Sequence, residues 1–431
     1  MRSTSRASRV AVTLAASALV LAACGDDGGE EEDTDTEPTA AETSEGGDAG
    51  AGATGDGTLT VGTLLPQTGD LAFLGPPEFA GVDTAVKDIN AAGGVNGKPV
   101  KQVKGDSGDG TPNIAPDETG KLLDGGSDVI VGAASSSVSL SVIDQITGAG
   151  VVHFSPANTS TAFDTYEDKG LYFRTAPSDV LQGAVMANLL TEDKHSNVAI
   201  MARQDSYGEA LADQIEKGFT SSGGTITEKV LYAAEAANFS AEVQQIADSQ
   251  PEAIVLIAFE ETTKIIPDMI QAGIGPKDLQ IYFVDGNTQN YGDAFDPGTL
   301  EGIKATYPGA ELTGDFRERM LETNPKLTDF TYGPESYDAT VLSALAATAA
   351  KDDSGEAIAS KLQEVSVGGT KCMTYEECVA LLEEGEDIDY DGVSGPIDFN
   401  DTGSPSAATI GIFEYGNDNT YSNIGYVTGQ T

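Results

Sequence analysis

The chain has 431 residues, of which 69 are Asp or Glu and 23 are Lys or Arg, so its formal net charge is −46. This length predicts two domains, or one domain with two lobes. Because so large a negative charge repels phosphate backbones, the composition argues against a nucleic-acid partner.

The first residues carry an export signal rather than part of a fold. Three arginines in the first ten residues precede the apolar run 11–23. This run is too short for a transmembrane span and indicates a signal peptide over residues 1–23. The stretch LAAC, Leu21–Cys24, resembles a bacterial lipobox, which implies cleavage before Cys24 and lipid on its sulfur. The lipid would anchor the protein to the outer face of the cell membrane. An ordinary signal peptide that contains a cysteine is the alternative.

Residues 24–57 are rich in Asp, Glu and Gly and contain no aromatic residue. Such a segment cannot bury enough apolar surface to offset the entropy of ordering, and its charges repel one another. It therefore predicts a disordered tether, with the folded part beginning near Thr58.

From Thr58 onward, short apolar segments alternate with amphipathic ones. DVIVGAASSS and VVHFSPANTS are strand-like and end in small polar residues. The segment 79–94 has helical apolar spacing and closes on Gly93 and Gly94, a common helix end. Two such series follow each other, with a break near residues 175–178. We expect an α/β fold of two Rossmann-like lobes, each with a parallel sheet between helices.

Ligands of open α/β sheets bind beyond the carboxyl ends of the strands. Those ends carry hydroxyl groups in the first series, among them Ser136 and Thr159, and Tyr207, Glu260 and Asp285 in the second. No phosphate-binding glycine motif follows a strand, which disfavours a nucleotide. Neutral donors facing carboxylates would suit a zwitterion such as an α-amino acid. The same residue types are also typical of ordinary turns and helix caps.

Cys372 and Cys378 are six residues apart in KCMTYEEC. In an exported protein such a local pair indicates a disulfide. A metal site is disfavoured because no third or fourth soft ligand is near.

An enzyme is disfavoured by the sequence. There is no G-x-S-x-G motif, and the two histidines are His153 in an apolar strand and His195 in a polar stretch. Glu260 and Asp285 are the one carboxylate pair that could be considered for acid–base work. We expect no catalytic residues and no cofactor.

From Thr58 onward the chain resembles the leucine/isoleucine/valine-binding family of extracytoplasmic receptors for ABC importers. The resemblance is carried by an ordered series of segments over nearly all of the mature domain: VGTLLPQTGDLAFLG, VIVGAASSSVSLSV, FSPANTSTAF, FRTAPSDVLQGAVMA, VAIMARQDSYGEALAD, NFSAEVQQI and GVSGPIDFN. It implies a type I periplasmic-binding protein with the ligand cleft between its lobes.

The resemblance also implies roles for individual residues. Ser136, the main chain of Ala157 and Thr159 match the positions that hold the head group of the ligand in the first lobe. Tyr207 matches a tyrosine of the cleft, and Asp285 matches the acidic partner of the ammonium group.

Two stretches of the sequence depart from the pattern of branched-chain receptors. Leu74 stands where an aromatic wall is common, and Phe259 and Glu260 stand where an aromatic residue would pack on the ligand side chain. A carboxylate there would disfavour a purely aliphatic side chain. The expected ligand is therefore an amino acid, branched-chain-like or related; amides, urea-like solutes and aromatic acids are the alternatives.

The resemblance further implies three crossovers between the lobes, near Ala176, Pro308 and Gly395. Lobe one would comprise residues 58–176 and 309–395, including the Cys372–Cys378 loop, and lobe two residues 177–308 and 396–431. A monomer that closes on its ligand and docks on a membrane permease would follow. A sensor that signals through a partner would use the same fold.

Overall fold

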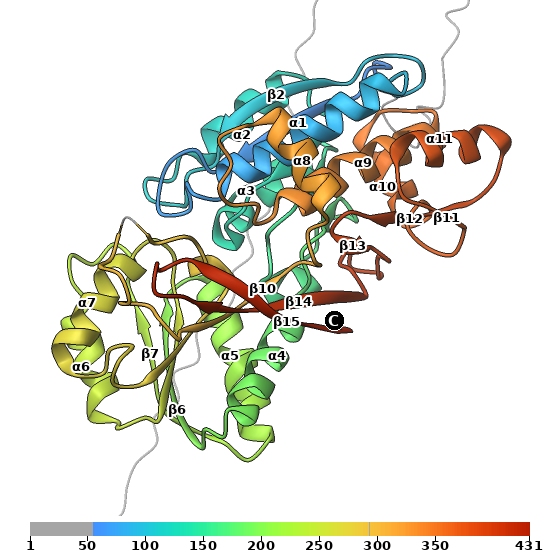
Figure 1. Ribbon diagram of the computed structural model, residues 1–431. Helices are drawn as coiled ribbons and strands as arrows, with labels where there is room; N and C mark the ends of the chain where they lie inside the picture. The colour runs from blue at the N-terminus through green and yellow to red at the C-terminus, as the bar shows by residue number, and fades with distance from the viewer. Residues whose placement is uncertain (1–54, 293) are drawn as a thin grey trace, which may run out of the picture. The chain divides into compact units, whose positions relative to one another are not determined.

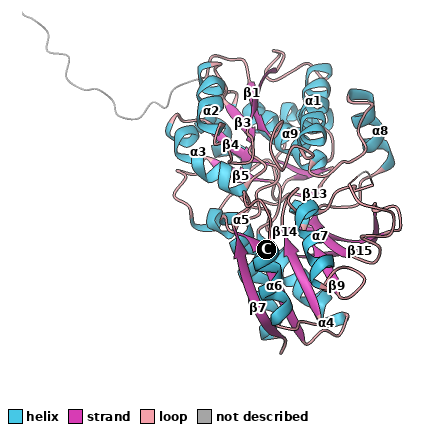
Figure 2. Cartoon of the chain, turned by 90° about the vertical axis from the view of Figure 1, so that its left-hand side faces the viewer, coloured by secondary structure: helices cyan, strands magenta, loops and turns pink. Residues whose placement is uncertain are grey.

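The computed structural model describes residues 55–431 except residue 293 (Figures 1 and 2). The expected signal peptide, Cys24 and most of the tether lie outside the described residues. The N–H of Gly55 donates to Asp352 Oδ1 at 3.0 Å, and the N–H of Gly57 donates to Asp353 Oδ1 at 2.9 Å. The chain therefore packs on the fold slightly before Thr58, where we expected the tether to end.

The first sheet is parallel throughout and has the strand order β2-β1-β3-β4-β5. Its strands are β1 (Thr60–Leu65), β2 (Lys101–Asp106), β3 (Val129–Gly132), β4 (Val152–Ser155) and β5 (Tyr172–Arg174). Val61 and Leu65 pack in one core cluster with α1 (Gly75–Ala91) and α9 (Gly333–Ala350). Leu64 packs in another with α2 (Ala115–Asp124) and α3 (Ser136–Gly148). Both faces are covered, which explains why these strands are apolar on both sides.

The rest of this lobe packs largely in the core shared with α1 and α9. Its elements are η1 (Thr161–Thr165), α8 (Gly314–Thr323), α10 (Gly355–Leu362), β11 (Thr370–Cys372), α11 (Tyr375–Glu384), β12 (Ile388–Gly392) and β13 (Gly395–Pro396). A disulfide joins Cys372 in β11 to Cys378 in α11, and both cysteines are buried in the core shared with α1 and α9.

The second sheet has the order β15-β14-β10-β9-β8-β6-β7. Its strands are β6 (Asn197–Arg203), β7 (Thr225–Tyr232), β8 (Ala253–Ile257), β9 (Gln280–Phe283), β10 (Lys304–Pro308), β14 (Ala407–Tyr415) and β15 (Tyr421–Gln430). The first five are parallel, as expected, whereas β14 and β15 pair antiparallel at one edge. Two parallel α/β layers confirm the expected fold class, with this antiparallel edge as an addition.

Four helices cover the second sheet. Helices α4 (Asp179–Glu192) and α5 (Ser206–Ser221) share a core cluster with one face of its central strands. The two helices lie side by side (Figure 1). Helices α6 (Ser240–Asp248) and α7 (Thr262–Ala272) share a cluster with the other face. The short helix η2 (Asp285–Asn287) follows the carboxyl end of β9.

The chain passes between the two sheets three times. The first passage, residues 175–178, links β5 to α4, and the second, residues 309–313, links β10 to α8. The third passage, residues 397–406, links β13 to β14. Ile397 and Phe399 at its start pack in the core of lobe one, so that lobe extends beyond Gly395, the boundary expected from the sequence.

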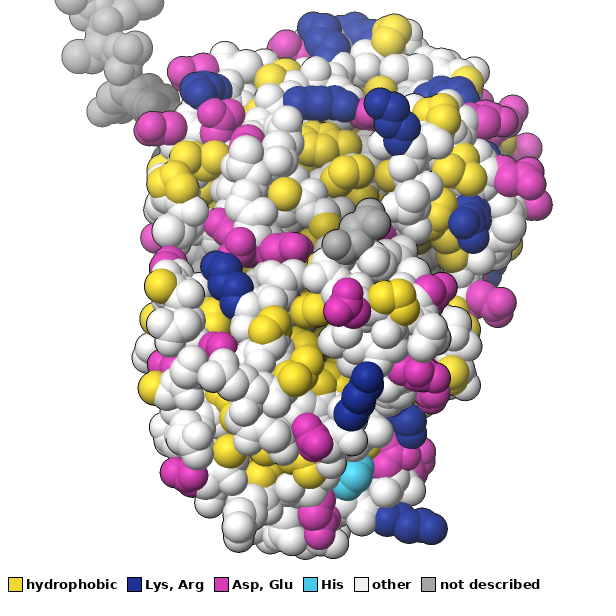
Figure 3. Space-filling model, turned by 60° about the vertical axis from the view of Figure 1, so that its left-hand side comes forward, with side chains coloured by type: hydrophobic (Ala, Val, Ile, Leu, Met, Phe, Trp, Pro, Cys, Tyr) yellow, Lys and Arg dark blue, Asp and Glu magenta, His cyan; other side chains and the backbone are white. Residues whose placement is uncertain are grey.

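Acidic side chains are distributed over the face shown in Figure 3 rather than gathered in one patch. Within residues 55–431, no helix is long and apolar enough to span a membrane.

Candidate ligand-binding site

A small cavity lies where the two lobes meet. Residues of both lobes line it: Leu71, Leu74, Ala134, Ser135, Ser136, Ala157 and Tyr332 from lobe one, and Tyr207, Phe259, Asp285 and Gly286 from lobe two. The structure thus brings together Leu74, Ser136, Ala157, Tyr207, Phe259 and Asp285 of the residues expected from the sequence.

The lobe-one wall is neutral and begins at helix α3. Ser135 is the N-cap residue of α3, but its hydroxyl makes no capping bond and has no partner among the described residues, although it is buried. The first N–H groups of a helix carry partial positive charge and attract anions. This wall can therefore donate hydrogen bonds to a carboxylate.

Ala157 lies in the segment that follows β4. Its N–H donates to the hydroxyl of Ser155 at 3.2 Å. No described residue donates a hydrogen bond to its carbonyl oxygen. A ligand ammonium group could donate to this oxygen. The neutral wall thus offers donors at α3 and an acceptor at Ala157.

Thr159 was expected to contact the ligand, but it does not line the cavity. Its side chain is buried, and its hydroxyl lies beside the carboxyl group of Asp179, where it opposes the rise of that group's pKa. Its carbonyl accepts from the N–H of Asp179 at 2.7 Å, which ties this segment to the start of α4. The structure places Thr159 behind the wall, next to Ala157.

Asp285 forms the acidic side of the cavity. Its Oδ1 accepts from Tyr207 Oη at 2.6 Å and from Gln182 Nε2 at 2.7 Å, and its Oδ2 accepts from Tyr332 Oη at 2.8 Å. Burial raises the pKa of Asp285, and the hydroxyl of Tyr207 is the largest influence that opposes this. The three donors stabilise a carboxylate that the low-dielectric surroundings alone would disfavour.

Tyr332, the residue before α9 in lobe one, contacts Asp285 of lobe two across the cleft. Its backbone has a φ of +58°, a left-handed conformation that is uncommon for a residue with a large side chain. Such conformations persist where the surroundings hold them and are frequent at functional sites.

The remaining wall is apolar. Leu71 and Leu74 face Phe259, whose ring stacks on Tyr207 with 5.5 Å between centroids. The guanidinium of Arg203 lies 3.4 Å from the centroid of Phe259. Arg203 is itself paired with Glu261 at 3.0 Å and with Asp205. Packing on Tyr207 and Arg203 therefore holds Phe259 in place.

Glu260 does not line the cavity, although the sequence placed it beside the ligand side chain. Its Oε2 accepts from Gln289 Nε2 at 2.8 Å, and its N–H donates to the carbonyl of Asp70 at 3.3 Å. The carboxylate is directed at lobe two. The expectation that this charge disfavours an aliphatic ligand assumed that it lies beside the ligand, and the structure does not place it there.

Sequence reasoning missed three polar residues at or behind the cavity: Asp179, Gln182 and Tyr332. Asp179 and Gln182 are three residues apart in DVLQG, a spacing that puts both on one helix face. Asp179 is fully buried, and burial, followed by the charge of Asp285, raises its pKa well above the usual range, while the hydroxyl of Thr159 opposes this rise. Tyr332 was missed because it precedes a helix and follows no strand.

Comparisons with known proteins agree with this fold. Residues 58–410 match the model of the family described as periplasmic binding protein. A chemotactic signal transduction system substrate-binding protein, BasB, of Halobacterium salinarum is 27% identical over 354 residues, 79% of this chain and 83% of that protein. The Leu/Ile/Val-binding protein homolog 2 of Brucella abortus is 27% identical over 381 residues, 86% and 94% of the two chains.

A solved structure shows the same fold. The branched-chain amino acid transporter substrate-binding protein LivJ of Streptococcus pneumoniae, in complex with isoleucine, superposes with a TM-score of 0.71 at 21% identity. The match covers 87% of this chain and all of that chain (100%).

Proposed function

The chain belongs to the periplasmic binding protein family, and we propose that it binds an α-amino acid between its lobes and delivers it to an ABC importer. The protein is a solute-binding receptor of the extracytoplasmic kind. The observation that carries the amino-acid proposal is the position of Asp285 across the cavity from the N-terminus of α3.

The two walls are complementary to a zwitterion. The ammonium group would lie between the carboxylate of Asp285 and the carbonyl of Ala157, and the carboxylate would accept from Ser135, Ser136 and the first N–H groups of α3. A buried charge without a partner costs several kcal/mol, so a ligand with only one of the two charges would bind less well.

The apolar wall supports a branched-chain or related side chain. Leu71, Leu74 and Phe259 line the part of the cavity that carries no charged group, and Glu260 lies outside it. The relative named as a Leu/Ile/Val-binding protein homolog is consistent with such a ligand.

A thermal-shift screen of the refolded protein tests this proposal. Refolding removes ligand carried through purification, and the screen compares aliphatic, aromatic and charged amino acids with amides and aromatic acids. A ligand at a hundred times its Kd adds roughly 2.7 kcal/mol of stability, a visible shift. We expect leucine, isoleucine or valine to shift the transition most. A shift with aromatic acids or amides alone would contradict the roles given to Asp285 and Ala157.

A ligand sensor is the second candidate, because the relative from Halobacterium salinarum is named as part of a chemotactic signal transduction system. Uptake of the labelled ligand and movement toward it, measured in cells with and without the gene, separate the two functions. Loss of uptake supports transport, and loss of movement with unchanged uptake supports sensing.

We extend the proposal to the anchor, the oligomeric state and the absence of catalysis. Lipid on Cys24 would hold a monomeric receptor near its permease, and a Cys24→Ser variant should leave the membrane fraction. His153 is fully buried in β4, where burial lowers its pKa to about 4, so it would stay neutral at physiological pH and serve packing. Continued membrane association of the variant, or turnover of a bound solute, would contradict this part.

A further inference from the structure

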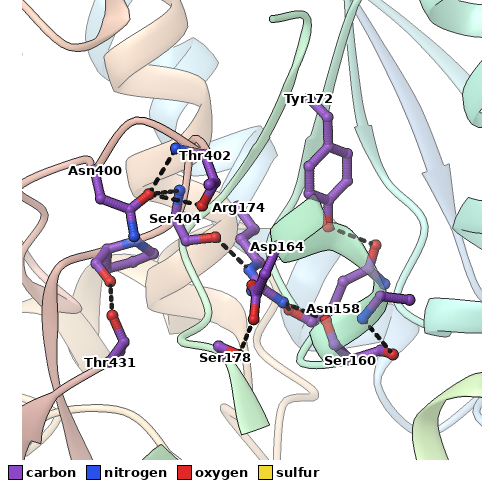
Figure 4. Close-up of polar contacts among 12 residues, drawn as sticks. Asn158, Ser160, Asp164, Tyr172, Arg174, Ser178, Asn400, Thr402, Ser404 and Thr431 are labelled. Carbon is purple, nitrogen blue, oxygen red and sulfur yellow. Dashed lines mark hydrogen bonds and ion pairs between the residues drawn. The ribbon is translucent and has the colours of Figure 1, made fainter. Parts of the chain in front are cut away.

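Arg174, the last residue of β5, is fully buried and stands at the centre of a polar network (Figure 4). Its Nη1 donates to the carbonyl oxygens of Asn158 at 3.3 Å and Ser160 at 2.9 Å. We call residues 155–160, which follow β4, the ligand turn, because Ala157 within it lines the cavity. Arg174 therefore holds the main chain of the ligand turn from behind, on both sides of Thr159.

The same guanidinium reaches the first passage. Its Nη2 pairs with the carboxylate of Asp164 in η1, and the other oxygen of that carboxylate accepts from Ser178 Oγ at 2.9 Å. Ser178 is the N-cap residue of α4, but its side chain makes no capping bond there. Its hydroxyl thus connects the passage to Arg174 and adds no cap to the helix.

The guanidinium also reaches the third passage, where its Nε donates to Ser404 Oγ at 2.8 Å. Ser404 is held in place by a tight turn, since Asn400 Oδ1 accepts from the N–H and hydroxyl of Thr402 and from the N–H of Ser404, as Figure 4 shows. The carbonyl of Gly403 accepts from the N–H of Arg174 at 2.9 Å. This turn is therefore bound to the end of β5 by both main chain and side chain.

Gly403 allows that close approach. Its φ is +67°, and a Cβ at this position would lie 2.3 Å from the carbonyl oxygen of Tyr172. Any other residue would push the turn away from β5. The position of Ser404 relative to Arg174 thus depends on a glycine.

The ligand turn also contacts lobe two. Ser160 Oγ donates to the carbonyl of Ser206 at the start of α5 at 2.7 Å, and the N–H of Ser160 donates to Ser136 Oγ at 3.3 Å. One end of the ligand turn therefore contacts a cavity residue of lobe one and the first turn of a lobe-two helix.

From these contacts we infer that Arg174 is a positioning residue that couples the ligand turn to the first and third passages between the lobes. The inference rests on the proposed function, in which the lobes close on a ligand. A movement of either passage relative to lobe one displaces Ser178 or Ser404, and the planar guanidinium transmits the displacement to the carbonyls beside Ala157. A lysine cannot replace it, because an ammonium lacks the fixed fork of donors.

Two variants test the coupling without removing the buried charge. Ser404→Ala removes the contact with the third passage, and Ser178→Ala removes the contact with the first. Each removes one hydrogen bond to a charged group outside the cavity, so we expect only part of that bond's strength to appear in the ligand affinity, as a loss of less than about tenfold. Ser343→Ala is the matched control, because this fully buried serine in α9 donates to the carbonyl of Ala339 at 2.7 Å and touches neither passage.

We would measure the Kd for L-leucine by calorimetry and the hydrogen exchange of residues 154–163 in the ligand-free full chain. We expect each passage variant to weaken binding about fivefold and to speed exchange in the ligand turn. The double variant should bind L-leucine at most about twofold more weakly than either single variant, because both substitutions act through one network. Arg174→Lys should resemble the double variant, and Ser343→Ala the unchanged protein.

Other outcomes would overturn the inference. Exchange and affinity that stay within twofold of the unchanged protein in both folded passage variants would show that Arg174 only supports the fold. Equal changes in Ser343→Ala, or fully additive losses in the double variant, would do the same. If L-leucine does not bind the unchanged protein, the proposed ligand is wrong, and the exchange of residues 154–163 decides the coupling by itself.

Discussion

Two buried acidic groups of this protein differ in the donors that surround them. In the cavity, Asp285 accepts hydrogen bonds from Tyr207, Gln182 and Tyr332. In lobe one, Glu78 on α1 is fully buried, and neither of its carboxylate oxygens has a partner among the described residues. Glu335 on α9 lies nearby and lines a second cavity, which the three passages border.

The difference teaches that burial alone does not decide what a carboxyl group can do. Burial raises the pKa of Glu335 to about 8, and burial together with the charge of Glu335 raises the pKa of Glu78 well above its usual range. Burial also raises the pKa of Asp285, but its three hydrogen-bond donors oppose this rise by favouring the charged form. The carboxyl groups of Glu78 and Glu335 are therefore suited to carrying a proton, and the carboxylate of Asp285 is suited to binding a cationic group of a ligand.

The largest expected effect follows from neutralising the acid of the cavity. Asp285→Asn keeps the size of the side chain but removes the charge that faces the ligand ammonium. Because hydrogen bonds between charged groups contribute roughly 1.5–3 kcal/mol, we expect affinity for the best amino acid of the screen to fall about tenfold to a hundredfold. Calorimetry measures the change.

The control for this variant is Asp248→Asn, which changes an exposed residue of α6. Unchanged affinity of a folded Asp285→Asn protein would remove Asp285 from the ligand contacts. If affinity falls and the melting temperature of the ligand-free variant also falls, the residue supports the fold and not the ligand contact.

Glu335→Gln tests the other acidic group through pH. The pKa of Glu335 rises from its ordinary 4.5 to about 8 on folding. The folded state therefore binds more protons than the unfolded state between these values, so this group's contribution to stability is lost as pH rises from about 4.5 to about 8. Above that range the contribution is constant.

The variant cannot ionise, so it should lose less stability than the unchanged protein between pH 5 and pH 9. We expect the stability difference between the two proteins to change by about 4 kcal/mol from pH 5 to pH 9. Urea unfolding at a series of pH values gives the two curves. Parallel curves would show that Glu335 ionises alike in the folded and unfolded states.

Tyr332→Phe reduces the hydrogen-bond donors of Asp285 from three to two. Asp285 then becomes more like Glu78, which has no donor among the described residues. The ring that lines the cavity remains, while Oδ2 of Asp285 loses its partner. We expect affinity to fall about threefold to tenfold, with a larger loss at pH 5 than at pH 8, because a less stabilised carboxylate takes up a proton more readily. Binding is measured at both pH values.

The matched control is Tyr375→Phe, whose hydroxyl donates to the carbonyl of Gly94 within lobe one. An equal loss of affinity in both variants, or no loss in Tyr332→Phe, would contradict the role of this tyrosine.

The smallest effect is expected for Glu260→Gln. Its carboxylate contacts Gln289 and does not line the cavity, so affinity for an aliphatic amino acid should stay within about twofold. A marked gain in affinity for aliphatic ligands, measured in the same calorimetric series, would show that the charge reaches the bound side chain.

Much of the fold was predictable, because its signals are local. Alternating apolar segments and Gly-ended helices such as the one that closes at Gly93 predicted two α/β lobes, and the ordered motifs predicted the family. The antiparallel strands β14 and β15 were not predicted, since an edge pair of this kind has no local signal that distinguishes it from a parallel strand. The extent of lobe one beyond Gly395 depends on where Phe399 packs.

The site was predictable where residues follow strands. Asp285, Tyr207 and Phe259 come after the ends of β9, β6 and β8, and all three line the cavity. Glu260 does not line the cavity, because a neighbour in sequence can point to the opposite side of a turn. Tyr332 could not be found this way, because it reaches Asp285 from 47 residues further along the chain.

The sequence by itself determined the class of the molecule and most residues of its cavity, because periodicity, turn residues and the carboxyl ends of strands are written within a few neighbouring positions. Only the tertiary structure decided which carboxylates meet donors, which stay without them, and how Arg174 joins Ser160 to Ser404. The physical reason is that the charge state and orientation of a buried group depend on partners from distant segments, and those partners meet only after the chain has folded.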